Sequence, residues 1–199
     1  MTDYTALDCG IAILREAHRF VDMHEVTPNA AWSRGADSVE LIRRLRETGW
    51  QLGWPYCAAL VEVCAAAGLE ALGERDLARL VRKRFSPSVM ETYDAVRPLV
   101  HRGVPAPGAV FFMRKGRGRL GHEGIVVLGG ERTFLTIEGN TSPGIVSGAK
   151  DREGDGIYCK IRRRDFAESA TELHLLGFLD PVDAHRAKEL LATQPHTET

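Results

Sequence analysis

Several features that mark special classes of protein are missing from this 199-residue chain. It has no run of about 20 apolar residues, so the sequence predicts no membrane span. The first ten residues contain Asp3 and Asp8 and no basic stretch ahead of an apolar core, unlike a secretory signal. Basic and acidic residues nearly balance, 26 against 27, which disfavours a nucleic-acid protein that binds by neutralising phosphates. We therefore expect a soluble globular protein, made in the cytoplasm without a Sec-type signal.

Cysteine is also scarce, with four residues spread over the chain: Cys9, Cys57, Cys64 and Cys159. Their spacing is not that of a disulfide framework, and the absence of a CxxC pair argues against a structural zinc site. A small buried thiol in a reducing compartment is the default interpretation for each cysteine. The context of Cys57 points to a different role.

The length and the order of the patterns indicate one α+β domain over residues 1–183, with a short, frayed tail over 184–199. Helical patterns come first, and residues 27–35 between the first two are typical of a loop. The predicted helices cover 6–24, 39–47, 55–68 and 74–101, the last broken near Pro87 and at Pro98. About five antiparallel strands follow, in 107–113, 122–128, 132–139, 156–163 and 173–179.

Three distant segments carry residues suited to nucleophilic catalysis. Cys57 lies near the start of the apolar helix, where unpaired backbone N–H groups and the helix dipole favour a thiolate. His122 opens an apolar strand, and a hairpin turning at residues 129–130 brings Glu138 near it. A carboxylate there orients the imidazole and stabilises its charged form. Asn140, two residues on, faces the same way on an extended strand and adds a polar contact.

With these residues, the sequence resembles the CHAP amidase/peptidase family, related to the NlpC/P60 cysteine peptidases of the papain-like fold. The matching segments are WPYCAALVEVC, PGAVFF, GHEGIVV and IEGNTS, in the family's order, and the resemblance covers residues 28–146. It implies N-terminal helices packed on a C-terminal antiparallel sheet. It also implies that Cys57 is the nucleophile, His122 the general base and Glu138 the residue that orients it, assisted by Asn140.

The resemblance further implies cleavage of amide bonds in peptidoglycan or a muropeptide, through an acyl-enzyme and without a metal or organic cofactor. The bond is either the one between sugar and stem peptide or one within the peptides. Three positions depart from the family pattern: Ala109 where Asp is common, Tyr56 in place of Trp, and Glu123 beside His122. Strand alternation predicts that Glu123 points to the opposite face from His122.

Side chains near these segments are candidates for substrate contact. Trp54 and Tyr56 precede the cysteine as walls of a pocket. Just before His122, a basic loop presents Arg114, Lys115, Arg117 and Arg119. This loop is either a solvated hairpin or a cationic lip for stem-peptide carboxylates or anionic wall polymer.

Other interpretations stay open from sequence alone. Cys57 and His122 could be inert core residues, Glu138 and Asn140 could belong to a surface turn, and a metal site on Cys57, His122 and Glu138 is chemically feasible. The same fold could be a silent peptidoglycan-binding module, or an acyltransferase that passes the acyl group to an amine. An enzyme acting on the wall or periplasm would need a non-classical route, through an export system or a holin, and an immunity protein is a conceivable partner.

Overall fold

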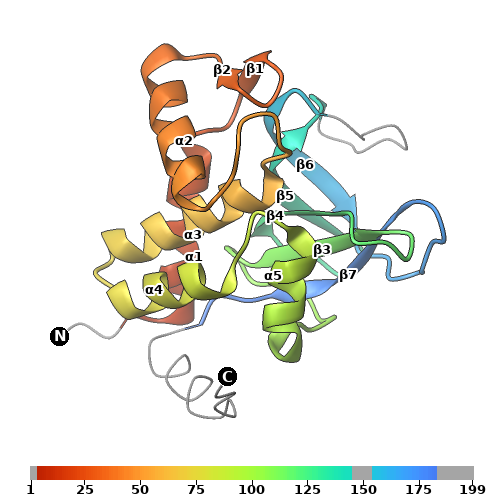
Figure 1. The fold of residues 1–199 in the computed structure, drawn as a ribbon. Coiled ribbons are helices and arrows are strands. Elements are labelled where there is room, and N and C mark those ends of the chain that lie inside the picture. Colours follow the sequence, from red (N-terminus) through yellow and green to blue (C-terminus); the bar gives the residue numbers. More distant parts are fainter. Residues whose placement is uncertain (1–3, 145–153, 183–199) are drawn as a thin grey trace, which may run out of the picture.

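The computed structural model describes residues 4–144 and 154–182. Within these ranges, five strands follow the helices, as the sequence predicts, but a short pair of strands also lies between the first two helices (Figure 1). The helices are α1 (Ala6–His18), α2 (Gly35–Glu47), α3 (Cys57–Ala71), α4 (Arg75–Arg84), α5 (Val89–Val96) and a 3₁₀ turn, η1 (Arg97–Leu99). The α+β class is confirmed, whereas the predicted tail, 184–199, lies outside the described residues.

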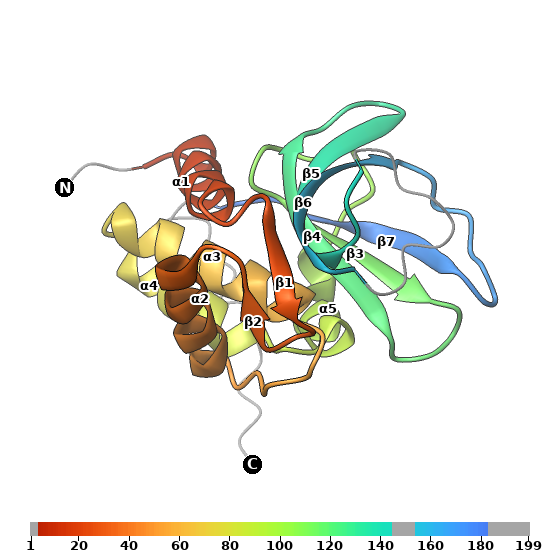
Figure 2. The same cartoon turned by 90° about the horizontal axis from the view of Figure 1, so that it is seen from above.

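The strands of the described residues form one seven-stranded antiparallel sheet. Its strands are β1 (Met23–Thr27), β2 (Ala31–Trp32), β3 (Val110–Lys115), β4 (Gly121–Leu128), β5 (Thr133–Thr141), β6 (Gly156–Arg163) and β7 (Leu173–Leu179). The spatial order is β2-β1-β6-β5-β4-β3-β7. Seen from above, α1 to α4 gather beside the curved sheet, while α5 packs against β3 and β4 (Figure 2).

The two strands at one edge of the sheet correct the sequence prediction. Residues 19–24 were expected to continue the first helix, and 27–35 to form a loop, but β1 and β2 occupy much of this region. The helix stops at His18, and Asp22 takes a positive φ of 64° that is incompatible with helix. The chain can then pair Met23 and His24 with β6. The count of about five strands was therefore too low by this short hairpin.

The apolar helix α3 was predicted to start at Pro55 and stop at Gly68, and both ends differ. The helix begins at Cys57 and runs through Gly68 to Ala71. Gly68 is needed for close packing, because a Cβ there would lie 2.7 Å from backbone atoms of Ala12 and Ile13 in α1. This glycine therefore marks a helix contact and not a helix end.

Apolar side chains cover both faces of the sheet. The larger cluster joins α1, α2 and α3 to one face, and includes Phe112, Ile125 and Ile137. The smaller cluster lies on the other face, with Phe111 and Val126 among its members. Helix α3 is buried along nearly its whole length between these helices and β4 and β5, which fixes its first residue against the sheet. Among the described residues, no helix is long and apolar enough to cross a membrane.

Candidate active site

Cys57 is the first residue of α3, and the structure places it beside His122 of β4. Its sulfur interacts by hydrogen bonding with the His122 ring and with the backbone N–H groups of Ala58 and Glu123. The residue is buried in the core cluster, with 5% of its surface exposed. The start of a buried helix thus supplies N–H donors suited to a thiolate.

Glu138 contacts the opposite side of the His122 ring. His122 Nε2 and Glu138 Oε2 are 2.7 Å apart, and both residues are buried. Because Nε2 is engaged by the carboxylate, Nδ1 is the ring nitrogen left for the sulfur. The Glu138 side chain passes over Gly124, where a Cβ would lie 2.9 Å from its Cγ. A glycine two residues after the histidine therefore leaves the space through which the carboxylate reaches the ring.

Two further residues, which the sequence did not single out, hold the Glu138 carboxylate. Arg162 of β6 donates from Nε to Oε1 at 2.8 Å and from a terminal nitrogen to Oε2 at 2.5 Å. The Thr136 hydroxyl donates to Oε1 at 2.6 Å. Both side chains lie on the same face as Glu138 by strand alternation. The only sequence signal for Arg162 was an arginine at an inward position of a strand next to β5.

The electrostatics of the cluster favour a charged pair between sulfur and ring. Burial alone would raise the pKa of Cys57, but the hydrogen bonds and charge of His122, with the two backbone donors, bring that pKa below its usual value. Burial alone would lower the pKa of His122, yet Cys57 and Glu138 raise it to about 9. For Glu138, Arg162 and His122 outweigh burial and hold the pKa well below its usual range. The lowered pKa of the thiol and the raised pKa of the imidazole both favour the thiolate–imidazolium form of the pair.

Asn140 does not take the position expected for it. A bulge separates Glu138 from Thr141, and Asn140 has a left-handed backbone with φ of 54°. The alternation that was expected to align Asn140 with Glu138 is therefore broken. Among the described residues, no hydrogen bond links the Asn140 side chain to His122; instead its backbone N–H donates to the Tyr56 hydroxyl.

Tyr56 is also placed differently from the expected pocket wall. Its side chain is fully buried, packs edge-on against Trp32, and accepts a hydrogen bond from Trp32 Nε1 at 3.0 Å. Burial contradicts the expectation that Tyr56 contacts a substrate directly. Trp54, in contrast, is 45% exposed, and its carbonyl accepts a hydrogen bond from Trp50 Nε1 at 2.8 Å. This bond fixes the backbone at Trp54, three residues before Cys57.

The basic residues before His122 divide between strand and turn. Arg114 and Lys115 are half-buried at the end of β3, whereas Arg117 and Arg119 are exposed in the turn that leads into β4. Arg119 forms an exposed ion pair with Asp94 of α5 at 3.2 Å. The turn therefore presents positive charge at the end of β4 that carries His122.

On the opposite face of β4, two other acidic side chains are buried in a different environment. As alternation predicts, Glu123 points away from the His122 face; it is fully buried, and neither carboxylate oxygen has a hydrogen-bond partner. Burial, reinforced by the charge of Cys57, raises its pKa well above the usual value. Glu62 of α3 is also buried, which raises its pKa to about 7 although Arg82 opposes the shift. Burial without a hydrogen-bond partner therefore favours the neutral form of Glu123.

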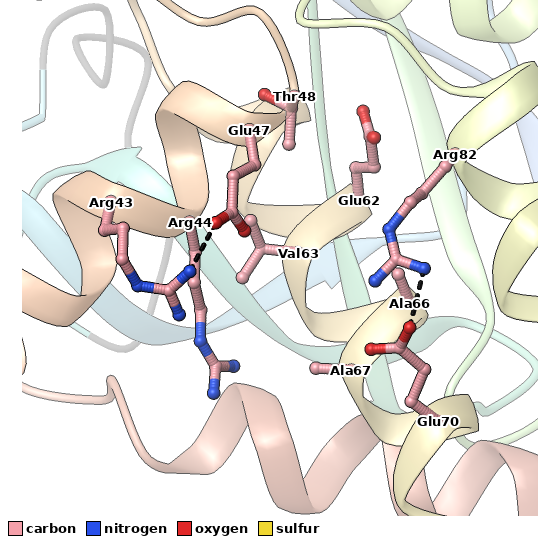
Figure 3. A pocket seen from close by; sticks show the side chains of 10 residues that line it. All are labelled: Arg43, Arg44, Glu47, Thr48, Glu62, Val63, Ala66, Ala67, Glu70 and Arg82. Carbon is pink, nitrogen blue, oxygen red and sulfur yellow. Dashed lines mark hydrogen bonds and ion pairs between the residues drawn. The ribbon is translucent and has the colours of Figure 1, made fainter. Parts of the chain in front are cut away.

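Glu62 also lines a hollow of about 240 Å³ between α2, α3 and α4 (Figure 3). Three arginines line it, and each has a carboxylate partner: Arg43 with Glu47, Arg44 with Glu16 and Glu40, and Arg82 with Glu70. A second, mostly apolar hollow of about 500 Å³ lies between α1, α4 and β7. Neither of these two hollows is lined by Cys57, His122 or Glu138.

Within the described ranges, no group of three or more His, Cys, Asp or Glu side chains is arranged to hold a metal ion. Cys57, His122 and Glu138 instead form a chain of hydrogen bonds with the ring in the middle. No protein-family model matches the chain, and no curated protein is significantly similar in sequence.

Proposed function

We propose that this protein is a cysteine hydrolase that cleaves amide bonds in peptidoglycan, with a CHAP-like variant of the papain-like fold. The observation that carries the proposal is the hydrogen-bonded chain Cys57–His122–Glu138, assembled from α3, β4 and β5. A nucleophile, a base and an orienting acid in contact are what covalent catalysis of acyl transfer requires. The choice of peptidoglycan or a muropeptide as substrate rests on the sequence resemblance.

The first half of the proposed reaction forms an acyl-enzyme. The Cys57 thiolate attacks the amide carbonyl carbon, and the backbone N–H of Cys57 at the helix start stabilises the developing oxyanion. As the C–N bond breaks, the imidazolium of His122 gives its Nδ1 proton to the leaving amine. A thioester and a neutral imidazole remain.

The second half releases the acid. Neutral His122 takes a proton from a water molecule, which attacks the thioester carbonyl, and the C–S bond breaks to give a carboxylic acid product and the thiolate. Glu138 keeps the ring oriented through both halves, because Nε2 donates to it whether or not Nδ1 carries a proton. The exposed Trp54 and the basic residues before His122 are the proposed substrate contacts.

The site of action is part of the same proposal. A wall substrate places the enzyme in the cell wall or periplasm, reached by a route that does not use a Sec-type signal. A muropeptide substrate instead allows action where the protein is made. Both substrates present the same amide chemistry to Cys57.

The test uses purified sacculi and mass spectrometry of the released fragments. Cys57→Ala removes the nucleophile, so release should fall to background, while circular dichroism shows an intact fold. Cys64→Ala is the matched control, because Cys64 is buried two turns further along the same helix, where burial raises the pKa of its thiol. Wild-type fragments should identify the bond cut, and release by Cys57→Ala near the wild-type rate excludes the proposal.

Thiol labelling separates an enzyme from a silent binding module of the same fold. Iodoacetamide at mildly acidic pH should modify Cys57 rapidly and leave the other cysteines largely unmodified, because only the thiolate reacts. Adding an amine acceptor to the fragment assay distinguishes hydrolysis from acyl transfer. Fragments ending in a free acid indicate hydrolysis, and fragments joined to the amine indicate a transferase.

A further inference from the structure

Arg162 provides the only two-pronged contact to the carboxylate of Glu138 among the described residues. It lies on β6, next to β5, and its side chain is 9% exposed. Its two donors reach the two oxygens of Glu138 at 2.8 and 2.5 Å, the paired geometry that arginine makes with carboxylates. Each oxygen has a second donor, from Thr136 or His122. Glu138 is therefore fully solvated by protein.

The proposed reaction changes the charge of His122 but must not change that of Glu138. When His122 is an imidazolium, it balances the buried carboxylate itself. When His122 has given up its proton, the carboxylate would remain as an uncompensated buried charge, which is strongly unfavourable. A guanidinium keeps its charge at every accessible pH, so Arg162 can balance Glu138 in both states.

We propose that Arg162 is a positioning residue that keeps Glu138 ionised through both protonation states of His122. The active form then contains four alternating charges: Cys57 negative, His122 positive, Glu138 negative and Arg162 positive. This inference rests on the proposed function for its role in turnover. Its effect on the thiol needs no substrate.

Each element packed around this row of four charges, from Cys57 to Arg162, contributes side chains that surround it. Helix α3 contributes Cys57, and β4 contributes His122 on one face and, on the other, Glu123, whose burial favours its neutral form. Strand β5 contributes Glu138 and the uncharged Thr136. Strand β6 contributes Arg162 and Lys160, whose ammonium donates to the Ser142 carbonyl at 3.0 Å. Strand β3 places two uncharged residues beside His122: Phe111, with 5.9 Å between ring centres, and Met113, the cross-strand partner of His122.

Loss of the fixed positive charge of Arg162 shifts thiolate formation at Cys57 in the same direction, whichever group takes up a proton. Without Arg162 the active row carries a net negative charge in a buried site, so uptake of a proton is favoured. If Cys57 takes the proton, the thiolate is lost directly. If Glu138 takes it, His122 loses the carboxylate that stabilises its charge, and the thiolate loses its partner. In both cases the thiolate of Cys57 forms only at higher pH.

The experiment measures the rate of Cys57 alkylation by iodoacetamide against pH in the full chain, with peptide mass spectrometry identifying the modified thiol. The midpoint is the pH at which the alkylation rate of Cys57 reaches half its maximum. In Arg162→Met this midpoint should rise by about one pH unit or more. Arg162→Lys keeps the charge but lacks the fork, so its midpoint should stay within about 0.3 unit of wild type. Arg164→Met removes a charge from a more exposed ion pair with Glu131 on the adjoining segment, and should leave the midpoint unchanged.

Three results would overturn the inference. The first is a folded Arg162→Met whose midpoint is unshifted, and the second is an equal shift in the methionine and lysine variants. The third is a wild-type Cys57 whose midpoint is no lower than that of an ordinary thiol. If Arg162→Met fails to fold, Arg162→Lys decides alone, because a shift of about one unit despite the retained charge contradicts the proposal. Failure of the proposed substrate is distinguishable. The protein would then leave sacculi intact, while the alkylation midpoints of wild type and the variants would still follow the pattern expected above.

Discussion

Two buried glutamates on opposite faces of the sheet have carboxyl pKa values shifted in opposite directions. Glu138 and Glu123 are both fully buried and both lie close to His122. Glu138 receives hydrogen bonds from three side chains, and the pKa of its carboxyl falls below the usual range. Glu123 has no hydrogen-bond partner, and burial raises the pKa of its carboxyl well above that range.

The difference shows that partners, and not burial, decide the charge of a carboxyl in this protein. Both carboxyls are removed from water, and this desolvation disfavours ionisation of each. Only on the Glu138 face does a guanidinium offset it, and only there can the carboxylate stabilise an imidazolium. The face that binds His122 is thus suited to proton transfer, whereas the Glu123 face holds a buried carboxyl whose neutral form is favoured.

The largest expected effect is on catalysis. Glu138→Gln preserves shape but removes the charge that orients and stabilises the His122 imidazolium, so fragment release from sacculi should fall by about 10²–10⁴-fold. Glu123→Gln replaces one neutral side chain with another, and release should stay within about threefold of wild type. Initial rates for both variants measure the contrast. Equal losses would show that the two faces do not differ in their catalytic contribution.

Stability should separate the two glutamates in opposite directions. Glu138→Met leaves the Arg162 guanidinium buried beside an apolar side chain, which should destabilise the fold by about 3–5 kcal/mol. Glu123→Met removes a buried polar group without partners, and should be neutral or stabilise the fold by about 1 kcal/mol. Urea unfolding at pH 7 gives both free energies. Marked destabilisation by Glu123→Met would mean that its carboxyl makes a stabilising interaction in solution.

The pH dependence of stability follows from the direction of each pKa shift. The folded pKa of Glu123 lies above its unfolded value, so wild type should lose stability relative to Glu123→Met as pH rises above about 4.5, by at most about 1.4 kcal/mol per unit. The folded pKa of Glu138 is depressed, so its contribution is present above about pH 4.5 and lost as pH falls. Urea unfolding at several pH values between 4 and 8 measures both slopes. Slopes of the same sign for the two methionine variants would contradict the assigned charge states.

His122 adds a dependence at higher pH. Its pKa is raised to about 9 in the folded protein, above the ordinary value of 6.5. The stability contributed by its charged form is therefore fully present below about pH 6.5 and is lost as pH rises through 9. His122→Gln should remove this alkaline loss, which the same unfolding series detects when extended to pH 10. An unchanged alkaline slope in the variant would assign the loss to another group.

The fold was predictable where the sequence pattern is local. Short apolar or alternating runs separated by Gly, Pro and charged residues predicted β3 to β7, because each of these strands buries several consecutive or alternate residues. The hairpin β1 and β2 was missed, since β1 has only one fully buried residue, Met23, and gains its order from pairing with β6. Gly68 was mistaken for a helix end because close packing of α1 and α3 depends on residues distant in sequence. Long-range contacts therefore account for the errors.

The same distinction applies to the candidate site. Cys57, His122 and Glu138 could be singled out because helix starts, strand alternation and a hairpin register place them with local rules. Asn140 was misplaced because a bulge with a positive φ interrupts the alternation after Glu138. Arg162 was missed because its partner lies on another strand, and its inward position in the segment GIYCKIRR does not by itself identify the carboxylate that it binds. The orienting residues were predictable, but their counter-charge was not.

The smallest expected effect contrasts arginines near the two regions. Arg117 is exposed beside the end of β4 that carries His122, whereas Arg43 lines the hollow between the helices and is paired with Glu47. If the turn attracts carboxylates of the substrate, Arg117→Gln combined with Arg119→Gln should raise KM about two- to fivefold with little change in kcat, because exposed charges act mainly on binding. Arg43→Gln is the matched control and should change neither constant.

Raising the salt concentration should weaken wild-type binding and reduce the difference in KM between wild type and the double variant, since exposed charges are screened. A KM equal to that of wild type at low salt would leave the turn as a solvated hairpin and assign substrate contact to other residues, such as Trp54.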